Sequence, residues 1–438
     1  MSLDDDLARS GRAIASTAAA SGPPGARRLR ARRRRARLLA GTALVLVACA
    51  GTAAVLQARD QGRTVIEPSD QTPSTRIEAG HGASRLITAE GSSLGSLPAV
   101  APDGTGDPVV GQVAGELLDD PAVADRLAAA GVTGDREARA ALLADAGLVI
   151  ETTIRPQALD AARASVGAGT ALVSIDPSTG EIVALAGPVG TAESEAGTLY
   201  LPFDMAAALA AGVGPAEQIP APGRFTSSAT SADGRPWVVS NIDQRDMGTV
   251  TLAEAVAQTA YTPWIALFDQ GRLDPAAVVD VAEQLGVTRP PPNMVLPASL
   301  IGIDSVNAVD MAEAYATFAT AGRRPDVHVV GRILAADGTV LYDAASRPAI
   351  SGPALDPGIA VQVRNALEQE ICCGSAADTA LGGDVAQFGQ IGRVPVGPAW
   401  FAGSTPDLTT VVWGGLSAQV WHSYMEQAAG AAGAGFPG

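Results

Sequence analysis

The residue types that most often carry chemistry are few and scattered in this 438-residue chain. All thirty basic residues are arginines, so no lysine is present to act as a general base or to form a Schiff base. The three histidines, His81, His328 and His422, lie far apart, and no Cys-x-x-Cys or His-Glu-x-x-His spacing occurs. We therefore expect no metal site and no cofactor.

The three cysteines cannot form a disulfide framework, because one of them, Cys49, lies alone inside an apolar run. The other two, Cys372 and Cys373, are neighbours in the sequence. This pair is either two inert thiols or a vicinal disulfide, and two inert thiols are the favoured interpretation.

The charge distribution and one apolar run predict a membrane anchor. Residues 1–37 carry ten arginines against three aspartates, whereas the rest of the chain is strongly acidic. The apolar run at 38–56 is nineteen residues long, and at about 1.5 Å per residue a helix of that length nearly spans a hydrocarbon core of about 30 Å. The positive-inside rule makes residues 1–37 a cytoplasmic tail. We expect a single-pass membrane protein with its C-terminal part outside the cytoplasm.

A second interpretation of the same run is a lipoprotein signal. Residues 46–49, Leu-Val-Ala-Cys, have the form of a bacterial lipobox, in which Cys49 would be lipidated after cleavage. The long N-terminal tail and the apolar residues that continue to Leu56 favour the uncleaved signal anchor. Either interpretation places residues 58–438 outside the cytoplasm.

Beyond the anchor, composition divides the chain into four further parts. Residues 58–107 are rich in Ser, Thr, Pro and Gly and predict a linker, and 108–146 predict a small helical connecting module. Residues 147–425 predict the main domain, and the Ala/Gly-rich 426–438 predict a loose tail.

The main domain alternates short strands with helical patterns, which indicates an α+β fold with an antiparallel sheet flanked by helices. Two hairpins are expected, at 170–187 with a turn at Asp176–Gly180 and at 327–342 with a turn at Asp337–Gly338. Other strands are expected at 148–154, 399–403 and 409–414. Helices are expected at 156–166, 203–212, 250–268, 275–286, 306–321 and 357–370.

Four segments of this domain resemble, in the same order, segments of the transpeptidase domain of class A penicillin-binding proteins. They are 147–157 (GLVIETTIRPQ), 172–185 (LVSIDPSTGEIVAL), 310–319 (DMAEAYATFA) and 400–413 (WFAGSTPDLTTVVW). The resemblance implies a penicillin-binding transpeptidase or β-lactamase-like fold with a helical subdomain. The glycosyltransferase domain that precedes this unit in class A members has no counterpart here.

That family catalyses acyl transfer with three motifs, Ser-x-x-Lys, Ser-x-Asn and Lys-Thr-Gly. Alignment on the neighbouring Pro202-Phe203 places Thr198 at the nucleophile and Leu201 at the base. The second motif falls on Thr259-Ala260-Tyr261 and the third on Gln390-Ile391-Gly392. By the resemblance, each motif has lost a residue that its role requires.

The leading hypothesis is therefore a pseudoenzyme that binds peptidoglycan or other proteins of cell-wall synthesis and does not bind nucleic acid. Vestigial motif positions are Thr198, Leu201, Thr259, Tyr261, Gln390 and Gly392. The alternative is an active peptidoglycan D,D-transpeptidase or penicillin-binding acyltransferase that uses Thr198 with an unidentified base. A third interpretation is a purely structural anchor, in which the linker and the cytoplasmic arginine cluster carry the function. The arginine cluster itself is most simply a topology signal.

Overall fold

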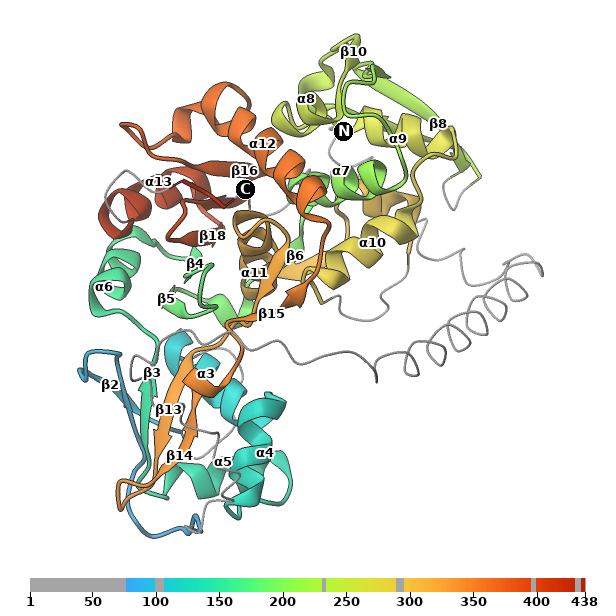
Figure 1. Ribbon diagram of the computed structural model, residues 1–438. Helices are drawn as coiled ribbons and strands as arrows, with labels where there is room; N and C mark the ends of the chain where they lie inside the picture. The colour runs from blue at the N-terminus through green and yellow to red at the C-terminus, as the bar shows by residue number, and fades with distance from the viewer. Residues whose placement is uncertain are drawn as a thin grey trace, which may run out of the picture.

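The computed structural model describes residues 76–98, 106–230, 234–288, 295–394, 399–429 and 435–437 (Figure 1). The predicted cytoplasmic tail at 1–37, the anchor at 38–56 and the lipidation site at Cys49 lie outside these residues. Within the described part, no helix has the length and apolar character that a membrane crossing requires.

A five-stranded antiparallel sheet forms the centre of the molecule, in the order β16-β17-β18-β4-β5. Its strands are β4 (Ala171–Ile175), β5 (Ile182–Ala186), β16 (Phe388–Gly392), β17 (Trp400–Ser404) and β18 (Thr409–Trp413). The predicted hairpin at 170–187 is confirmed as β4 and β5. Every residue of these two strands is buried, because helices cover both faces of the sheet.

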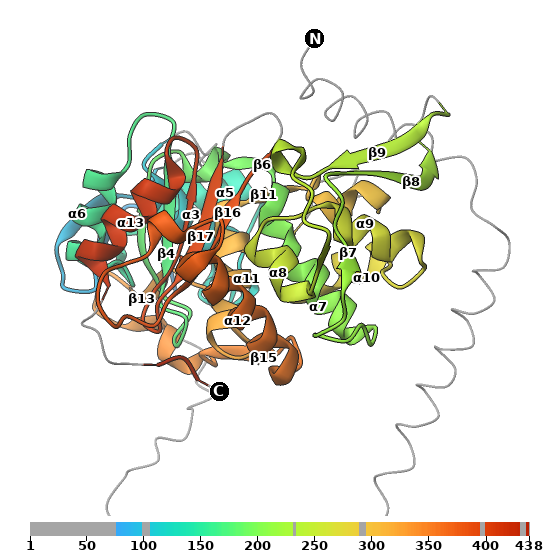
Figure 2. The same cartoon turned by 90° about the horizontal axis from the view of Figure 1, so that it is seen from above.

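Four helices surround this sheet (Figures 1 and 2). One face packs against α11 (Ala308–Ala319), and the other packs against α6 (Pro156–Ser165) and α13 (Ser417–Ala428). The helix α12 (Pro357–Cys373) lies along the edge strand β16. Three of these helices, α6, α11 and α12, lie where the sequence predicted helices. The fourth, α13, was not predicted and lies at the end of the predicted domain.

A second five-stranded sheet, in the order β14-β13-β3-β1-β2, belongs to a smaller lobe at the bottom of Figure 1. Its strands are β1 (Arg85–Ile87), β2 (Ser93–Ser96), β3 (Val149–Thr152), β13 (Val330–Leu334) and β14 (Val340–Asp343). The helices α3 (Pro108–Asp119), α4 (Pro121–Ala129) and α5 (Arg136–Ala144) complete this small lobe. Because β1 pairs with β3 in parallel, this sheet is mixed, unlike the expected antiparallel sheet.

The small lobe differs from the predicted division of the chain at two places. Part of the predicted linker at 58–107 forms β1 and β2, with Leu86 fully buried. The predicted boundary at residue 147 also falls inside the lobe, since β3, β13 and β14 share its sheet with β1. Both differences have one cause, the pairing of β1 with β3. It joins segments more than sixty residues apart, such as Arg85 with Val149, and local hydrophobic periodicity does not reveal such a contact.

A helical subdomain lies beside the central sheet and comprises α7 (Leu201–Ala210), α8 (Leu252–Ala257), α9 (Thr262–Asp269) and α10 (Pro275–Gln284). The single helix predicted at 250–268 is divided into α8 and α9, because Thr259 between them has a positive φ of 51°. A hairpin of β8 (Arg224–Thr230) and β9 (Pro236–Ser240), which the sequence did not predict, extends beyond α9 (Figure 2).

The remaining elements are short. They are β6 (Glu193–Glu195), β7 (Ile219–Pro220), β10 (Thr249–Val250), β11 (Ser305–Asn307), β12 (Arg323–Pro325), β15 (Ile350–Pro353), and the 3₁₀ turns η1 (Val189–Thr191), η2 (Gly197–Tyr200), η3 (Ile242–Gln244), η4 (Pro297–Ile301), η5 (Ala344–Ser346) and η6 (Ala377–Thr379).

The prediction of a loose tail at 426–438 is wrong for its described end. The Phe436 ring lies 5.2 Å from the Phe388 ring and 5.2 Å beneath the Arg364 guanidinium, measured between centres. Arg364 Nη1 also donates to the Pro437 carbonyl oxygen at 2.6 Å. Phe436 and the buried Arg364 thus hold residues 435–437 in place, although the Ala/Gly-rich composition of the tail predicted no such contact.

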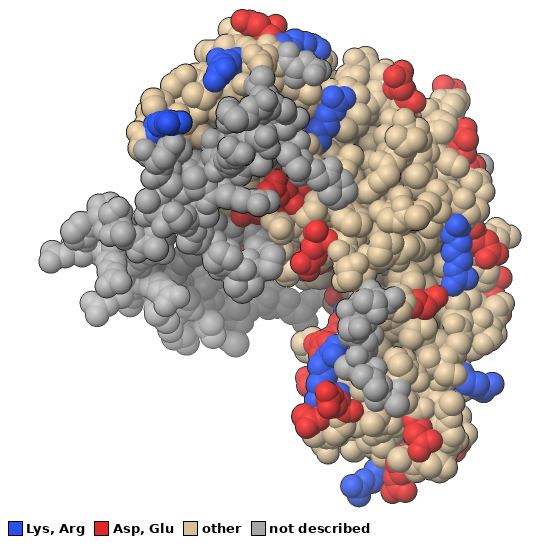
Figure 3. All heavy atoms as spheres, turned by 180° about the vertical axis from the view of Figure 1, so that it is seen from behind, with Lys and Arg blue, Asp and Glu red and all other residues tan. Residues whose placement is uncertain are grey.

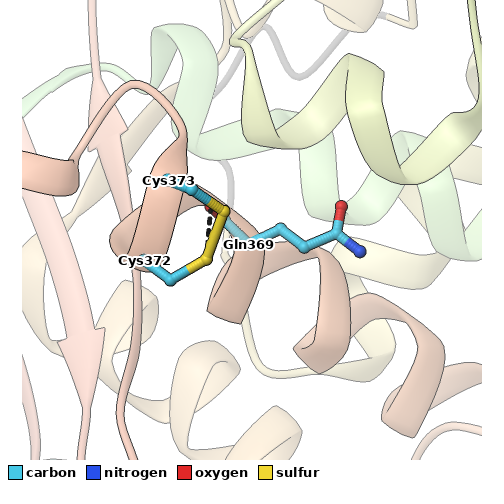
Figure 4. Close-up of a disulfide and its surroundings, with 3 residues drawn as sticks. All are labelled: Gln369, Cys372 and Cys373. Atoms are coloured by element: carbon cyan, nitrogen blue, oxygen red, sulfur yellow. Dashed lines mark hydrogen bonds between the residues drawn. A yellow bond between two sulfur atoms is a disulfide. The ribbon is translucent and has the colours of Figure 1, made fainter.

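The preference for two free thiols at the end of α12 is also corrected, because the structure joins Cys372 and Cys373 in a disulfide (Figure 4). Their sulfur atoms lie 3.5 Å and 3.4 Å from the Gln369 carbonyl oxygen, so both side chains turn toward the same point of the last helical turn. Both cysteines are exposed at the surface.

Candidate functional site

Two of the predicted site residues, Thr198 and Tyr261, meet the end of the edge strand β16, which carries the third predicted motif. The elements that lie along this edge are η2, α12 and the start of α9. An edge strand presents unpaired N–H and C=O groups that can accept another chain. Here side chains of the protein itself form hydrogen bonds with backbone groups at the end of β16. We call the five residues involved, Thr198, Tyr261, Glu370, Ile391 and Arg393, the edge cluster.

Thr198 is fully buried in η2 and is fixed to the edge strand by three hydrogen bonds. Its hydroxyl donates to the Ile391 carbonyl oxygen and accepts from the Arg393 N–H at 2.8 Å. Its own N–H donates to the Arg393 carbonyl oxygen at 3.1 Å. A hydroxyl has one proton to give, and this proton goes to a peptide oxygen that cannot act as a base.

The backbone donors nearest to the Thr198 hydroxyl are engaged as well. Acyl transfer requires N–H groups that face the developing oxyanion. The N–H groups of Thr198 and Arg393 both donate to atoms of this same residue pair. The preceding Gly197 has a φ of 56°, and a Cβ there would meet the Arg393 carbonyl oxygen at 2.0 Å. Only glycine permits this close contact, which holds η2 against the strand.

Leu201 lies one turn after Thr198, at the first position of α7, as the helical spacing predicted. Its side chain is fully buried in the main hydrophobic core. An alkyl side chain cannot accept a proton, so the position expected for the base contributes to packing and not to proton transfer.

Thr259 is not brought to Thr198. Its hydroxyl donates to the Gln258 carbonyl oxygen at 2.8 Å and lies 3.2 Å from the Ser375 hydroxyl, in the turn after α12. A β-branched residue rarely adopts a positive φ, so this conformation is held by the surrounding structure.

Tyr261 does reach the site. Its hydroxyl donates to the Arg393 carbonyl oxygen at 2.9 Å, and burial raises its pKa. Its backbone N–H donates to Asn241 Oδ1 at 2.9 Å, and the Thr262 N–H donates to the same atom at 3.0 Å. Asn241 therefore caps the start of α9 and positions the ring of Tyr261 against the strand. The sequence prediction did not include Asn241.

The third motif position forms part of β16. The Gln390 side chain is fully buried, and none of the described residues provides a hydrogen-bond partner for its amide oxygen or nitrogen. At Gly392 a Cβ would lie 2.3 Å from Trp400 Cβ and 2.7 Å from Leu199 Cγ. Close packing thus requires this glycine, whereas Gln390 carries neither the positive charge nor the contacts of a substrate clamp.

Arg393 takes part through its backbone. Its side chain is exposed, but its positive charge is close enough to lower the pKa of Tyr261 and of Glu370, which partly opposes the effect of burial.

The part of the chain that the structure describes contains no cluster of three or more His, Cys, Asp or Glu side chains that could hold a metal ion.

Two buried carboxyls complete the site and were missed by the sequence analysis. Glu370 on α12 accepts the Ile391 N–H at 2.9 Å, and burial raises its pKa well above its usual range. Asp204 on α7 is also fully buried with a strongly raised pKa, and its carboxyl oxygens have no hydrogen-bond partner among the described residues. The sequence around Glu370 does not distinguish it from a solvated helical acid. Asp204 did carry a signal that the sequence analysis missed, because it is the one charged residue in the apolar segment of α7, and a helix that is apolar on all sides is typically buried.

No protein-family model matches the chain. It is 30% identical over 303 residues to penicillin-binding protein 1A of Mycobacterium tuberculosis, a match that covers 61% of this chain and 36% of that protein. It is 29% identical over 309 residues to penicillin-binding protein 1A of Mycolicibacterium smegmatis, covering 62% and 38%. The match therefore spans little more than a third of the length of these relatives.

Solved structures show the same relationship. Penicillin-binding protein PonA1 from M. tuberculosis superposes with a TM-score of 0.62 and 25% identity, covering 75% of this chain and 92% of that one. Penicillin-binding protein A from M. tuberculosis, in a ceftriaxone acyl-enzyme complex, superposes with a TM-score of 0.60 and 19% identity, covering 80% and 99%. The chain is thus a homologue of class A penicillin-binding proteins over their transpeptidase region, and its fold is that of a penicillin-binding transpeptidase domain.

Proposed function

We propose that this chain is a non-catalytic member of the penicillin-binding transpeptidases, a pseudoenzyme that acts by binding in cell-wall synthesis. The observation that carries the proposal is the hydrogen bonding of Thr198. Its hydroxyl and its N–H are both consumed by the end of β16, and Leu201 stands where a base is needed.

The size of the expected loss supports this conclusion. Removing a nucleophile–base unit costs on the order of 10⁴–10⁶ in rate. Here the base is absent, the hydroxyl is engaged and the edge of the strand is covered, and each change removes a separate contribution. No lysine elsewhere in the chain can replace the base.

The partners that we propose are peptidoglycan or other proteins of cell-wall synthesis, consistent with the penicillin-binding proteins that the chain resembles. We also propose that the apolar run at 38–56 anchors the chain in the cell membrane, with the transpeptidase-like domain outside the cytoplasm. A reporter that is active only in the cytoplasm, fused after Gly438, should give no signal. A signal from it would contradict this topology.

A turnover assay tests the loss of catalysis. The purified full-length chain should release no D-alanine from a peptide that ends in D-alanyl-D-alanine. Release that disappears in a Thr198→Val variant, and persists in a Thr191→Val variant at an exposed threonine, would establish an active enzyme instead. Binding is tested separately by co-sedimentation with isolated peptidoglycan, where recovery of the chain in the pellet is expected.

A further inference from the structure

A polar groove with a volume of about 480 Å³ lies where the small lobe meets the central sheet. Its lining comes from β3, from the start of β13, from the turn before β5 and from η5. Since β5 and β16 are opposite edges of the central sheet, this groove is separate from the edge cluster. Its volume lies within the range of about 300–1,000 Å³ that is typical of small-molecule sites.

Two arginines in this groove retain donors for a ligand. Arg155 contacts described residues through a single nitrogen, Nη2, which lies 2.7 Å from Asp176 Oδ2 and 3.1 Å from Glu181 Oε2. Arg332 Nη1 lies 3.0 Å from Glu151 Oε2, and its Nε lies 3.5 Å from Asp343 Oδ2. A guanidinium has five N–H groups, so each arginine has donors left over. Their side chains are 42% and 40% exposed and can be reached by a ligand.

A bulge in β13 aims one of these arginines at the groove. The pairing of β13 with β3 shifts between Val330 and Arg332, so that Gly331 is the additional residue. Val330 and Ile333 are buried, while Gly331 and Arg332 are both partly exposed and line the groove. Bulges of this kind re-aim side chains and occur often beside functional sites. A Cβ at Gly331 would lie 3.2 Å from the Glu151 carbonyl oxygen, so the glycine allows β13 to lie close to β3 at the bulge.

The groove carries charges of both signs in close alternation. Arg155 lies beside Glu181, and Arg332 lies beside Glu151 and Asp343. All three carboxylates also line the groove. On the small lobe at the bottom of Figure 3, several basic and acidic side chains likewise lie next to one another. A simple anion would be repelled by the glutamates and a simple cation by the arginines. A ligand with both charges can satisfy both.

We propose that this groove binds a short peptide that carries both a free carboxylate and a free ammonium group. The carboxylate lies against the unused guanidinium N–H groups of Arg332, and the planar fork of an arginine suits a carboxylate. The ammonium donates to Glu181 or Glu151. This site goes beyond the proposed function and does not depend on whether the chain catalyses acyl transfer.

Isothermal titration of the full-length chain with trialanine tests the proposal, at up to about 10 mM so that even a Kd of about 1 mM is detected. Two blocked analogues, N-acetyl-trialanine and trialanine amide, each remove one charge. We expect trialanine to bind and each analogue to bind at least about tenfold more weakly, a loss of about 1.4 kcal/mol. No heat with trialanine, or equal binding of either analogue, would overturn the proposal.

Variants place the binding in the groove. Arg332→Gln should abolish trialanine binding, whereas Arg136→Gln, which removes a comparable exposed arginine from an ion pair with Asp119 on the small lobe, should not change it. Ala345→Trp keeps every charge and obstructs the exposed rim, and it should also abolish binding. Unchanged binding by both Arg332→Gln and Ala345→Trp, with unchanged melting temperatures, would show that the ligand binds elsewhere.

Discussion

Thr198 and Arg393 bind each other twice: the Arg393 N–H donates to Thr198 Oγ1 at 2.8 Å, and the Thr198 N–H donates to the Arg393 carbonyl oxygen at 3.1 Å. With the bond from the Thr198 hydroxyl to Ile391, this reciprocal pair joins η2 to the end of β16. The residue at the nucleophile position therefore serves as a structural link between two elements that are almost two hundred residues apart.

Thr198→Val should accordingly lower stability. Valine has nearly the same shape, so the change isolates the hydroxyl. It leaves the partly buried Arg393 N–H and Ile391 carbonyl without that partner. We expect the free energy of unfolding to fall by about 1–3 kcal/mol in urea denaturation. Thr198→Ser, which keeps the hydroxyl, should lose less. Equal stability of Thr198→Val and the parent chain would mean that these bonds contribute nothing.

Asp204→Asn should stabilise the chain at high pH. Burial raises the pKa of Asp204 in the folded state well above its unfolded value of about 3.9, so its contribution to stability is fully present at low pH and is lost as pH rises. Asparagine cannot ionise. The gain should be near zero at pH 4 and reach a few kcal/mol at pH 8. Asp160→Asn, the same substitution at an exposed position of α6, provides the matched control.

Glu116 on α3 makes a related prediction for the small lobe. Its carboxyl accepts the Val329 N–H at 2.6 Å, and burial is the main cause that raises its pKa to about 8. The parent chain should therefore lose stability as pH rises from about 4.5 to 8, and Glu116→Gln should reduce that slope. Glu116→Ala removes the acceptor as well and should lower the melting temperature at every pH. An unchanged slope in Glu116→Gln would contradict the raised pKa.

The double variant Thr198→Ser/Leu201→Lys should not restore acyl transfer. It returns a primary hydroxyl and an amine, but Tyr261 still covers the edge of β16 and Gln390 still offers no positive charge. The new ammonium would also be buried in the main core without a partner, which should destabilise the chain by a few kcal/mol. We expect a lower melting temperature and no rapid labelling by penicillin. Rapid labelling would show that the other two motif positions are less degraded than proposed.

The sequence predicted those parts of the fold that local patterns encode. The hairpin of β4 and β5 follows from two apolar runs around an Asp-Pro-Ser-Thr-Gly turn, and β17 and β18 follow from the same kind of pattern. The strands β1 and β2 could not be predicted in this way. The three residues of β1 become a strand by pairing with β3, and the Ser- and Gly-containing β2 then pairs with β1. The contact with β3 has no local signature in the sequence.

For the candidate site, the sequence predicted positions but not contacts. Thr198, Tyr261 and the third-motif strand do meet, as their places in the order of motifs implied, whereas Thr259 turns away toward Ser375 because its backbone has a positive φ. The role of Glu370 could not be foreseen. A glutamate near the end of a helix is usually solvated, and only the position of α12 along β16 buries it against the Ile391 N–H.

The most direct test of the central claim is the intact mass of the full-length chain after prolonged incubation with penicillin G. Penicillin-binding protein A of M. tuberculosis, for which a penicillin G acyl-enzyme complex has been solved, provides the positive control. We predict that the mass of this chain does not change, while the control gains one penicillin. A stoichiometric adduct that maps to Thr198 would contradict the account, because it would require a hydroxyl that the edge cluster holds in hydrogen bonds to act as a nucleophile.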